Sequence, residues 1–224
     1  MSILSTVGIE LPDTFPVEPY EKIHAIVTAK KEKNENGWKE YAIAWNAIPY
    51  RYASLLKYND RYAELVAGHG NSPSPEIRAE QEEAIFNFFM AGFSIIDTLG
   101  YAMYAIAGYA NASRFPLTDE MKPNVNLVMV MEKFRAYFKN EKITSSMKGI
   151  LESQEYGEWK VVRNILMHRG QPGRKIHAGG EENGVAEWIT GIAVDENLLS
   201  GRLEWVSSAI GELMESLLDL ASTL

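Results

Sequence analysis

A long stretch with almost no charge is the feature that most restricts how this chain folds. Between Glu83 and Arg114 the only charged residue is Asp97, and the stretch is rich in Phe, Ile, Ala and Tyr. If helical, it is long enough to span a bilayer, or it forms a helix buried on most sides within a bundle. A central Asp costs about 2.5–3.5 kcal/mol on insertion scales, and no compensating basic flank precedes the stretch. We therefore expect the central helix of a soluble bundle, and no membrane partner.

This stretch belongs to a longer predicted helix. Ser74 followed by Pro75 is typical of a helix start, with the serine as cap and the proline in the first turn. We expect the helix to cover residues 75–112. Small residues within it, among them Gly92 and Gly100, would let neighbouring helices approach closely.

The rest of the chain also follows helical spacing, so the predicted class is mainly α. Residues 17–33 predict a short helix and residues 37–68 a longer helical region, which Pro49 should kink or divide because proline lacks an amide donor. Further helical segments are expected over three ranges: 124–140, 144–169 with a break near Gly157, and 195–222.

Two segments interrupt the helical pattern. A Gly-Gly-Glu-Glu-Asn-Gly turn between short extended runs predicts a β-hairpin or irregular insertion near 175–193. The sequence HGNSPSP at 69–75 is the clearest internal linker. We expect an N-terminal helical extension over 1–70 that packs on a helical bundle over 71–224, within one compact unit.

Composition excludes several classes of function. The net charge of -8 argues against nucleic-acid binding through bulk positive charge, so any such site must be local. The chain has no Cys, which excludes thiolate zinc sites and a Cys nucleophile. His24, His69 and His177 lack ligand-like spacing, so we expect no metal and no cofactor. The first residues do not resemble a signal peptide, and the expected location is the cytoplasm.

The segment 158–177 combines an apolar stripe with a polar arc. At 100° per residue, the residues expected to face the core are Trp159, Val162, Ile165 and Leu166. Asn164 and His168 lie one turn apart on the opposite side and can touch. Arg163 and His168 are separated by about 140° around the helix and flank the polar arc. One helix therefore does not bring Arg163 and His168 together.

The same segment is a basic island in an acidic protein. From residue 160 to 177 there are five Lys or Arg and two His, with no Asp or Glu. Such an island can form charge-assisted hydrogen bonds to a phosphate. The candidate phosphate-binding or RNA-binding residues are Lys160, Arg169, Arg174, Lys175 and His177. The alternative is that these cations only stabilise a helix C-terminus and a solvated loop.

The sequence RNILMH at 163–168 resembles the R-x4-6-H motif of the HEPN superfamily, in which the Arg is commonly followed by Asn, Asp or His. The context is similar as well: a Trp-containing helix leads into the motif, and an aromatic-rich helix with a central Asp lies upstream. The resemblance covers about residues 75–222 and leaves the N-terminal 70 residues unmatched.

The resemblance implies an up-and-down helical bundle that forms a homodimer, with two such motifs lining one cleft. Many active members of this superfamily are metal-independent endoribonucleases that leave a 2′,3′-cyclic phosphate. Carried over, His168 would be the general acid–base group, Arg163 would stabilise the phosphate, and Asn164 would orient His168 or the substrate. The roles implied are those of a toxin, stress or defence protein that acts on RNA, with a cognate antitoxin or accessory protein as a partner.

Two other functions stay open from the residues alone. One is a non-catalytic HEPN-like module that binds a nucleotide, RNA or protein partner through the same cleft. The other is a helical interaction protein with only a chance resemblance. Polar residues gather opposite an apolar stripe, within an acid-free basic stretch. This pattern favours the ribonuclease and the HEPN-like binding module over a chance resemblance.

Overall fold

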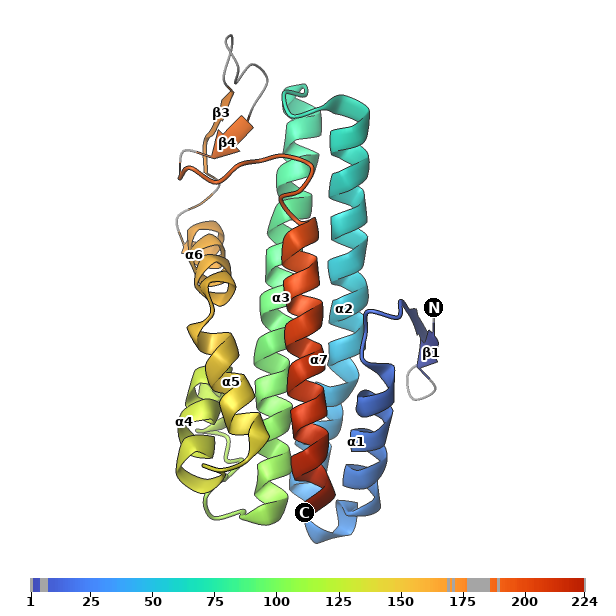
Figure 1. Ribbon diagram of the computed structural model, residues 1–224, viewed down its shortest axis with the longest axis vertical. Helices are drawn as coiled ribbons and strands as arrows, with labels where there is room; N and C mark the ends of the chain where they lie inside the picture. Colours follow the sequence, from blue (N-terminus) through green and yellow to red (C-terminus); the bar gives the residue numbers. More distant parts are fainter. Residues whose placement is uncertain are drawn as a thin grey trace. The chain divides into compact units, whose positions relative to one another are not determined.

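The computed structural model describes residues 2–4, 8–168, 170, 172–176, 186–188 and 190–223. Its described residues form seven α-helices and two small antiparallel strand pairs, which confirms the mainly α class (Figure 1). The helices are α1 (Val17–Ala29), α2 (Glu35–His69), α3 (Pro75–Ala110), α4 (Leu127–Tyr137), α5 (Lys142–Glu152), α6 (Gln154–His168) and α7 (Ser200–Thr223).

The two strand pairs lie far apart in the sequence. Strand β1 (Ser2–Leu4) pairs with β2 (Ile9–Leu11), which the sequence did not predict. Strand β3 (Arg174–Ile176) pairs with β4 (Ala186–Trp188), with Lys175 opposite Glu187. The second pair confirms the hairpin expected near 175–193, while the predicted Gly-rich turn lies outside the described residues.

The start of α3 lies where its sequence predicts it, whereas one break between helices lies elsewhere. Helix α3 begins at Pro75, and the Ser74 hydroxyl lies 3.5 Å from the amide nitrogen of Ile77, as expected of a cap. The break expected near Gly157 falls instead at Ser153, between α5 and α6.

Pro49 does not divide α2, which runs unbroken from Glu35 to His69. A proline at this position cannot donate to the carbonyl four residues earlier, that of Trp45. The hydroxyl of Tyr20 on α1 donates to this carbonyl instead, at 3.2 Å. Of the two predicted effects, a kink or a division, the division is therefore wrong, because a tertiary hydrogen bond satisfies the carbonyl that proline leaves open.

The chain divides into two compact units by its internal contacts. Unit 1 comprises Met1–Tyr52, Ser94–Ser153 and Ser207–Leu224, and unit 2 comprises Ala53–Phe93 and Gln154–Val206. Helices α2, α3 and α7 each contribute to both units. This division does not follow the boundary expected at residue 70.

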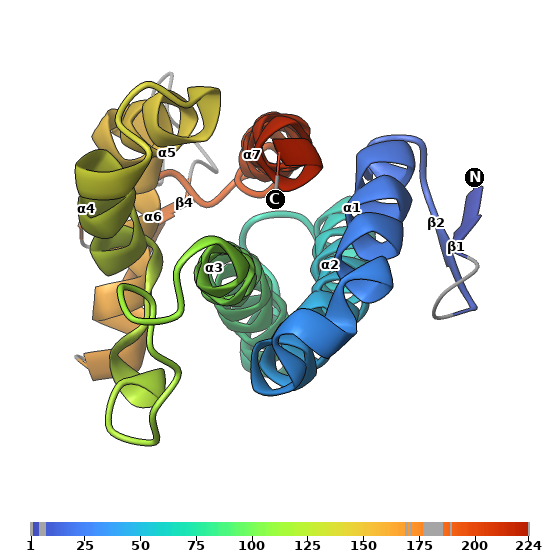
Figure 2. The ribbon, with the colours of Figure 1, turned by 90° about the horizontal axis from the view of Figure 1, so that it is seen from below.

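Unit 1 is held by aromatic packing and close helix approach. Figures 1 and 2 show α1 alongside the first part of α2, where the rings of Tyr20 and Trp45 stack with centroids 4.9 Å apart. A Cβ at Gly100 would lie 3.1 Å from the backbone of Leu127, so the predicted close approach at this glycine is confirmed.

Unit 2 is built around Trp159 of α6. Its ring lies 4.8 Å from that of Phe89, 5.5 Å from that of Phe88 and 5.9 Å from that of Trp205. A Cβ at Gly92 would overlap the indole of Trp159, so only glycine leaves room for this ring. The small residue expected to permit close helix approach is thus found directly against the main aromatic anchor of α6.

The apolar helix α3 is mostly an interior element. By length and composition it could cross a membrane, but 67% of its most apolar window is buried inside the protein. Asp97 interacts with the guanidinium of Arg51 from α2; burial lowers the pKa of Arg51, and the Asp97 carboxylate opposes that shift. Burial of this kind is typical of the core helix of a soluble protein.

Candidate functional site

Helix α6 places its apolar and polar sides as the sequence predicted. Trp159 and Val162 are fully buried, and Ile165 and Leu166 are 9% and 7% exposed. Lys160 and His168 are exposed, and Asn164 is half-buried between them on the opposite arc. The apolar side fixes the rotation of α6 about its axis, so the polar arc is directed to solvent.

Arg163 lies at the border between these two sides. Its guanidinium carbon lies 5.0 Å from the ring centroid of Phe93, a cation–π distance. The Nη1 group of Arg163 donates a hydrogen bond to Oδ1 of Asn164 at 3.2 Å. Phe93 in turn stacks on Tyr156, with centroids 6.1 Å apart. Arg163 is therefore held by an aromatic surface below it and an amide beside it.

His168 is the last residue of α6, and its side chain is exposed. The described residues show no hydrogen bond between His168 and Arg163. Helix geometry accounts for this, because positions five residues apart point about 140° away from each other. A single copy of α6 thus presents an exposed imidazole and a separately fixed guanidinium.

Two large apolar side chains share the exposed arc. Val161 is 53% exposed and Met167 is 47% exposed. With Asn164 between them along the helix, they place uncovered apolar surface next to the polar candidates. Uncovered apolar side chains beside polar ones are a feature of protein–protein contact surfaces.

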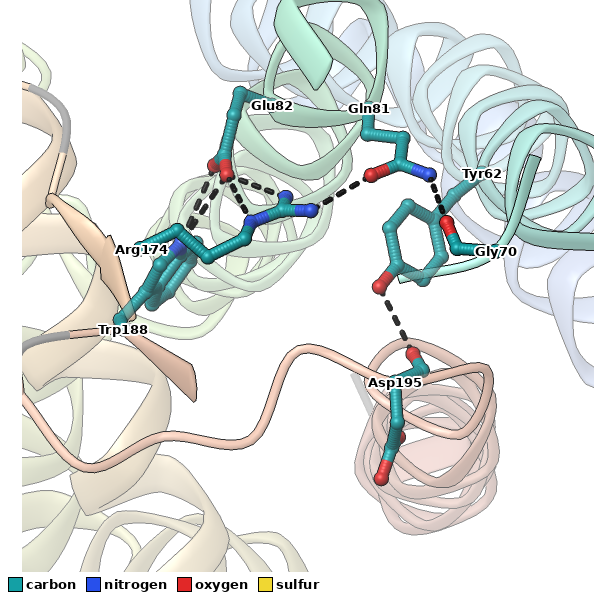
Figure 3. A network of polar contacts seen from close by, with 7 residues as sticks. All are labelled: Tyr62, Gly70, Gln81, Glu82, Arg174, Trp188 and Asp195. Atoms are coloured by element: carbon teal, nitrogen blue, oxygen red, sulfur yellow. Dashed lines mark hydrogen bonds and ion pairs between the residues drawn. The ribbon is translucent and has the colours of Figure 1, made fainter. Parts of the chain in front are cut away.

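Arg174, predicted as a phosphate-binding residue, is instead at the centre of a buried polar network (Figure 3). Its side chain is 1% exposed and forms an ion pair with Glu82, with its Nε donating to Oε1 of Glu82 at 3.0 Å. Its Nη1 donates to Oε1 of Gln81 at 2.7 Å, and Gln81 donates to the carbonyl of Gly70 at 3.0 Å. This leaves Arg174 no exposed surface for a phosphate, so the structure separates it from the other candidates.

The same network fixes the β3–β4 hairpin. The indole nitrogen of Trp188 on β4 lies 3.3 Å from Oε2 of Glu82. A separate hydrogen bond runs from the hydroxyl of Tyr62 to the carbonyl of Asp195, at 2.8 Å (Figure 3). Burial raises the pKa of Tyr62 well above its usual range, so this hydroxyl stays a donor at any physiological pH. The function of Arg174 is therefore to hold the hairpin on α3.

The remaining predicted cations are distributed along unit 2. Lys175 is exposed on β3, with its Nζ 3.4 Å from a carboxylate oxygen of Glu187. Lys160 is exposed on α6. Arg169 and His177 lie outside the described residues.

A cavity of about 760 Å³ lies beside α6. Gly157, Glu158 and Val161 line it from α6, and further lining comes from the segment 190–198 and from Arg202 in the first turn of α7. The sequence did not predict this cavity. Its one local signal was Arg202, because the positive end of a helix dipole disfavours a cation in the first turn.

Arg202 has an unusual environment. Its Nη1 donates to the carbonyl of Leu198 at 2.7 Å, and its Nη2 lies 3.6 Å from Oε2 of Glu158. Burial lowers the pKa of its guanidinium, and the carboxylates of Glu158 and Asp195 oppose this shift. Its Nε is buried and has no hydrogen-bond partner within the described part of the chain.

The described residues bring together no group of three or more His, Asp or Glu side chains that could hold a metal ion. Comparisons of the chain with models of known families, with curated proteins and with solved structures gave no match.

Proposed function

We propose that this protein is a metal-independent endoribonuclease of the HEPN type, with its active site on the polar arc of α6. The observation that carries this proposal is the placement of Arg163, Asn164 and His168. The helix exposes His168 at its end, while Phe93 and Asn164 fix the Arg163 guanidinium. An exposed imidazole and a fixed guanidinium supply the two functions that RNA cleavage without a metal requires.

The reaction follows from these two groups. The ribose 2′-oxygen attacks the adjacent phosphorus, and the bond from phosphorus to the 5′-oxygen breaks, which gives a 2′,3′-cyclic phosphate and a free 5′-hydroxyl. An imidazole takes the 2′-hydroxyl proton or gives a proton to the leaving oxygen. The guanidinium stabilises the negative charge that develops on the phosphate oxygens. In this scheme Asn164 positions Arg163, to which it is hydrogen-bonded.

A second copy of the chain completes the site in this proposal. Arg163 and His168 point to different sides of one helix, so a twofold axis near Asn164 would bring Arg163 of one copy toward the partner's His168. The exposed Val161 and Met167 supply apolar surface for such a contact. Because the protein carries a net charge of -8, RNA would be held by local cations such as Lys160 rather than by the whole surface.

The proposed setting is cytoplasmic, in a toxin, stress or defence role, with a cognate antitoxin or accessory protein that covers the same arc. A second candidate is a non-catalytic module that binds RNA, a nucleotide or a protein through this arc. The exposed Val161 and Met167 on the same arc favour it, since uncovered apolar side chains beside polar ones are typical of a binding surface.

The test is cleavage of mixed RNA by the purified protein in excess EDTA, with the ends of the products identified. We expect cyclic-phosphate ends and a loss of about 10²–10⁴-fold in rate for His168→Ala. His69→Ala is the matched control, because His69 is also an exposed histidine in the last turn of its helix. If RNA is bound but left uncleaved, the binding module replaces the ribonuclease; if His168→Ala cleaves like wild type, α6 is not the site.

A further inference from the structure

The cavity beside α6 carries hydrogen-bonding groups that the proposed cleavage chemistry does not use. Its volume of about 760 Å³ falls within the roughly 300–1,000 Å³ typical of small-molecule sites. Val161 and Ile192 give it apolar walls, while Glu158, Asp195 and Arg202 place two carboxylates and one guanidinium along it. Apolar walls with a few convergent polar groups are the usual composition of a ligand site.

The guanidinium of Arg202 has hydrogen-bonding capacity left over. One nitrogen is used by the carbonyl of Leu198, and the approach of Nη2 to Glu158 at 3.6 Å is longer than a hydrogen bond. The buried Nε has no partner in the described residues. The Nη2 group of Arg202 therefore remains able to donate a hydrogen bond to an oxygen acceptor of a ligand.

The two carboxylates supply the complementary function. Oε1 of Glu158 accepts from the amide of Gln154 at 2.9 Å, and Oδ1 of Asp195 accepts from the backbone amide of Asn197 at 2.8 Å. A carboxylate has about four acceptor positions, so each retains several. The cavity therefore favours a ligand with N–H donors next to an oxygen acceptor.

Among nucleobases this pattern singles out guanine. Its Watson–Crick edge has the O6 acceptor beside two adjacent N–H donors, N1 and N2, whereas adenine, cytosine and uracil each offer a single donor group there. The flat ring would lie between the apolar walls at Val161 and Ile192. We propose that the cavity beside α6 is a guanine-binding subsite, with O6 accepting from Arg202 and the N1 and N2 donors directed to Glu158.

The position of the cavity links it to the proposed active site. Gly157 and Val161 line the cavity and lie on the same side of α6 as His168. Glu158, which would hold the base edge, and His168 are ten residues apart, or about 15 Å along the helix axis. This separation suits a base seated in the cavity while a phosphodiester bond of the same nucleotide reaches His168. As a statement about RNA substrates, the inference rests on the proposed ribonuclease function.

The first experiment measures binding without cleavage. Calorimetric titration of the full chain with the 5′-monophosphates of guanosine, inosine and adenosine keeps the phosphate constant and varies only the base. We expect guanosine monophosphate to bind about tenfold more tightly than the other two. Inosine lacks the N2 donor, and adenine has a donor at N6 and an acceptor at N1, the opposite of guanine at both positions. Equal affinity for all three would overturn the guanine subsite.

Matched variants locate the binding. Glu158→Gln replaces one carboxylate acceptor with an amide, and we expect it to lower the affinity for guanosine monophosphate by about tenfold. Glu155→Gln is the control, an exposed glutamate one turn earlier on α6 that is not among the cavity-lining residues. Gly157→Trp fills the cavity from a helix position with open space around its Cβ, and should abolish binding while leaving the fold intact. Identical binding by Glu158→Gln and Glu155→Gln would contradict the assignment.

The second experiment separates this inference from the ribonuclease proposal. RNA oligonucleotides with a single guanosine or a single adenosine are incubated with the protein in EDTA. Cleavage only at the guanosine, lost in Gly157→Trp, supports both proposals. A guanosine preference in binding with no cleavage supports the subsite and overturns the ribonuclease, while cleavage without base preference does the reverse.

Discussion

Arg163 and Arg174 come from the same acid-free basic stretch, yet their surroundings in unit 2 are opposite. Arg174 is 1% exposed, with Glu82 and Gln81 taking up its donors. Arg163 is half-exposed, and its partners are the ring of Phe93 and the amide of its neighbour Asn164. The carboxylate of Glu82 neutralises Arg174. Within the described residues Arg163 has an aromatic ring and an amide as partners, so its positive charge is not neutralised.

This contrast distinguishes a cation that holds the fold from one whose charge is available to a ligand. A buried arginine paired with a carboxylate positions elements of the fold, and its charge is not available to a ligand. An arginine fixed by a ring and an amide keeps a full positive charge toward solvent, in a defined orientation that a phosphate can use. The basic stretch suggested phosphate binding for Arg174, and the HEPN resemblance implied a phosphate-stabilising role for Arg163; the distant partner Glu82 separates the two arginines.

The largest expected effect is on stability at Arg174. Arg174→Ala removes the guanidinium that neutralises the mostly buried Glu82 carboxylate, so we expect the free energy of unfolding to fall by about 3–5 kcal/mol. Urea denaturation followed by tryptophan fluorescence measures this change. The double replacement Arg174→Met with Glu82→Leu removes both charges and should recover most of the loss. A loss below about 1 kcal/mol for the single variant would place the pair among ordinary surface ion pairs.

Arg163→Ala should show the reverse pattern. We expect it to lower the rate of RNA cleavage by about 10²–10³-fold, because the guanidinium acts on the transition state. Its effect on the free energy of unfolding should stay near 0.5–1 kcal/mol, roughly the value of an exposed cation–π contact with Phe93. Cleavage assays and urea denaturation on the same preparation give both numbers. If stability falls as far as in Arg174→Ala, the two arginines are not different in kind.

The position of Arg163 depends on how the buried side of α6 packs, and a substitution at Gly92 tests that packing. A methyl group at Gly92 would overlap the indole of Trp159, so Gly92→Ala should destabilise the protein by about 1–3 kcal/mol. Gly149→Ala is the matched control, because Gly149 is a mid-helix glycine with open space around it. The control should be neutral or stabilising by up to about 1 kcal/mol. Equal thermal midpoints for both variants would show that Trp159 is not held against Gly92.

The smallest expected change in the free energy of unfolding comes from Tyr20, which measures the strength of one structural hydrogen bond in unit 1. Tyr20→Phe leaves the Trp45 carbonyl opposite Pro49 without its donor, and we expect a loss of about 1–2 kcal/mol in the free energy of unfolding. In a Pro49→Ala background the new amide can donate to that carbonyl, so the same tyrosine change should cost less. Equal losses in both backgrounds would mean that the tyrosine does not substitute for the proline.

Local periodicity was enough to predict part of the fold and part of the site. The buried stripe of α6 and the start of α3 follow from residues within one or two turns of each other, and the structure confirms both. The helix break at Ser153 and the continuity of α2 through Pro49 were not predicted. In the second case the deciding contact comes from Tyr20, 25 positions away from Trp45.

The site shows the same limit more sharply. The sequence identified Asn164 and His168 as residues on a polar arc, because that arc is a property of one helix. It did not identify Phe93 beneath Arg163 or Glu82 beside Arg174, since these partners lie on α3 and their pairing is set by packing. The cavity at Arg202 depends on three segments of chain and had only one local signal.

The most direct test of the central claim is a purified heterodimer of two inactive variants. Arg163→Ala and His168→Ala chains carrying different affinity tags are produced together, isolated through both tags and assayed for RNA cleavage in EDTA. If Arg163 of one copy acts with the partner's His168, one of two sites is intact, and activity should return to about half that of the wild type. A heterodimer as inactive as its parents, or no heterodimer at all, would contradict a shared site on α6.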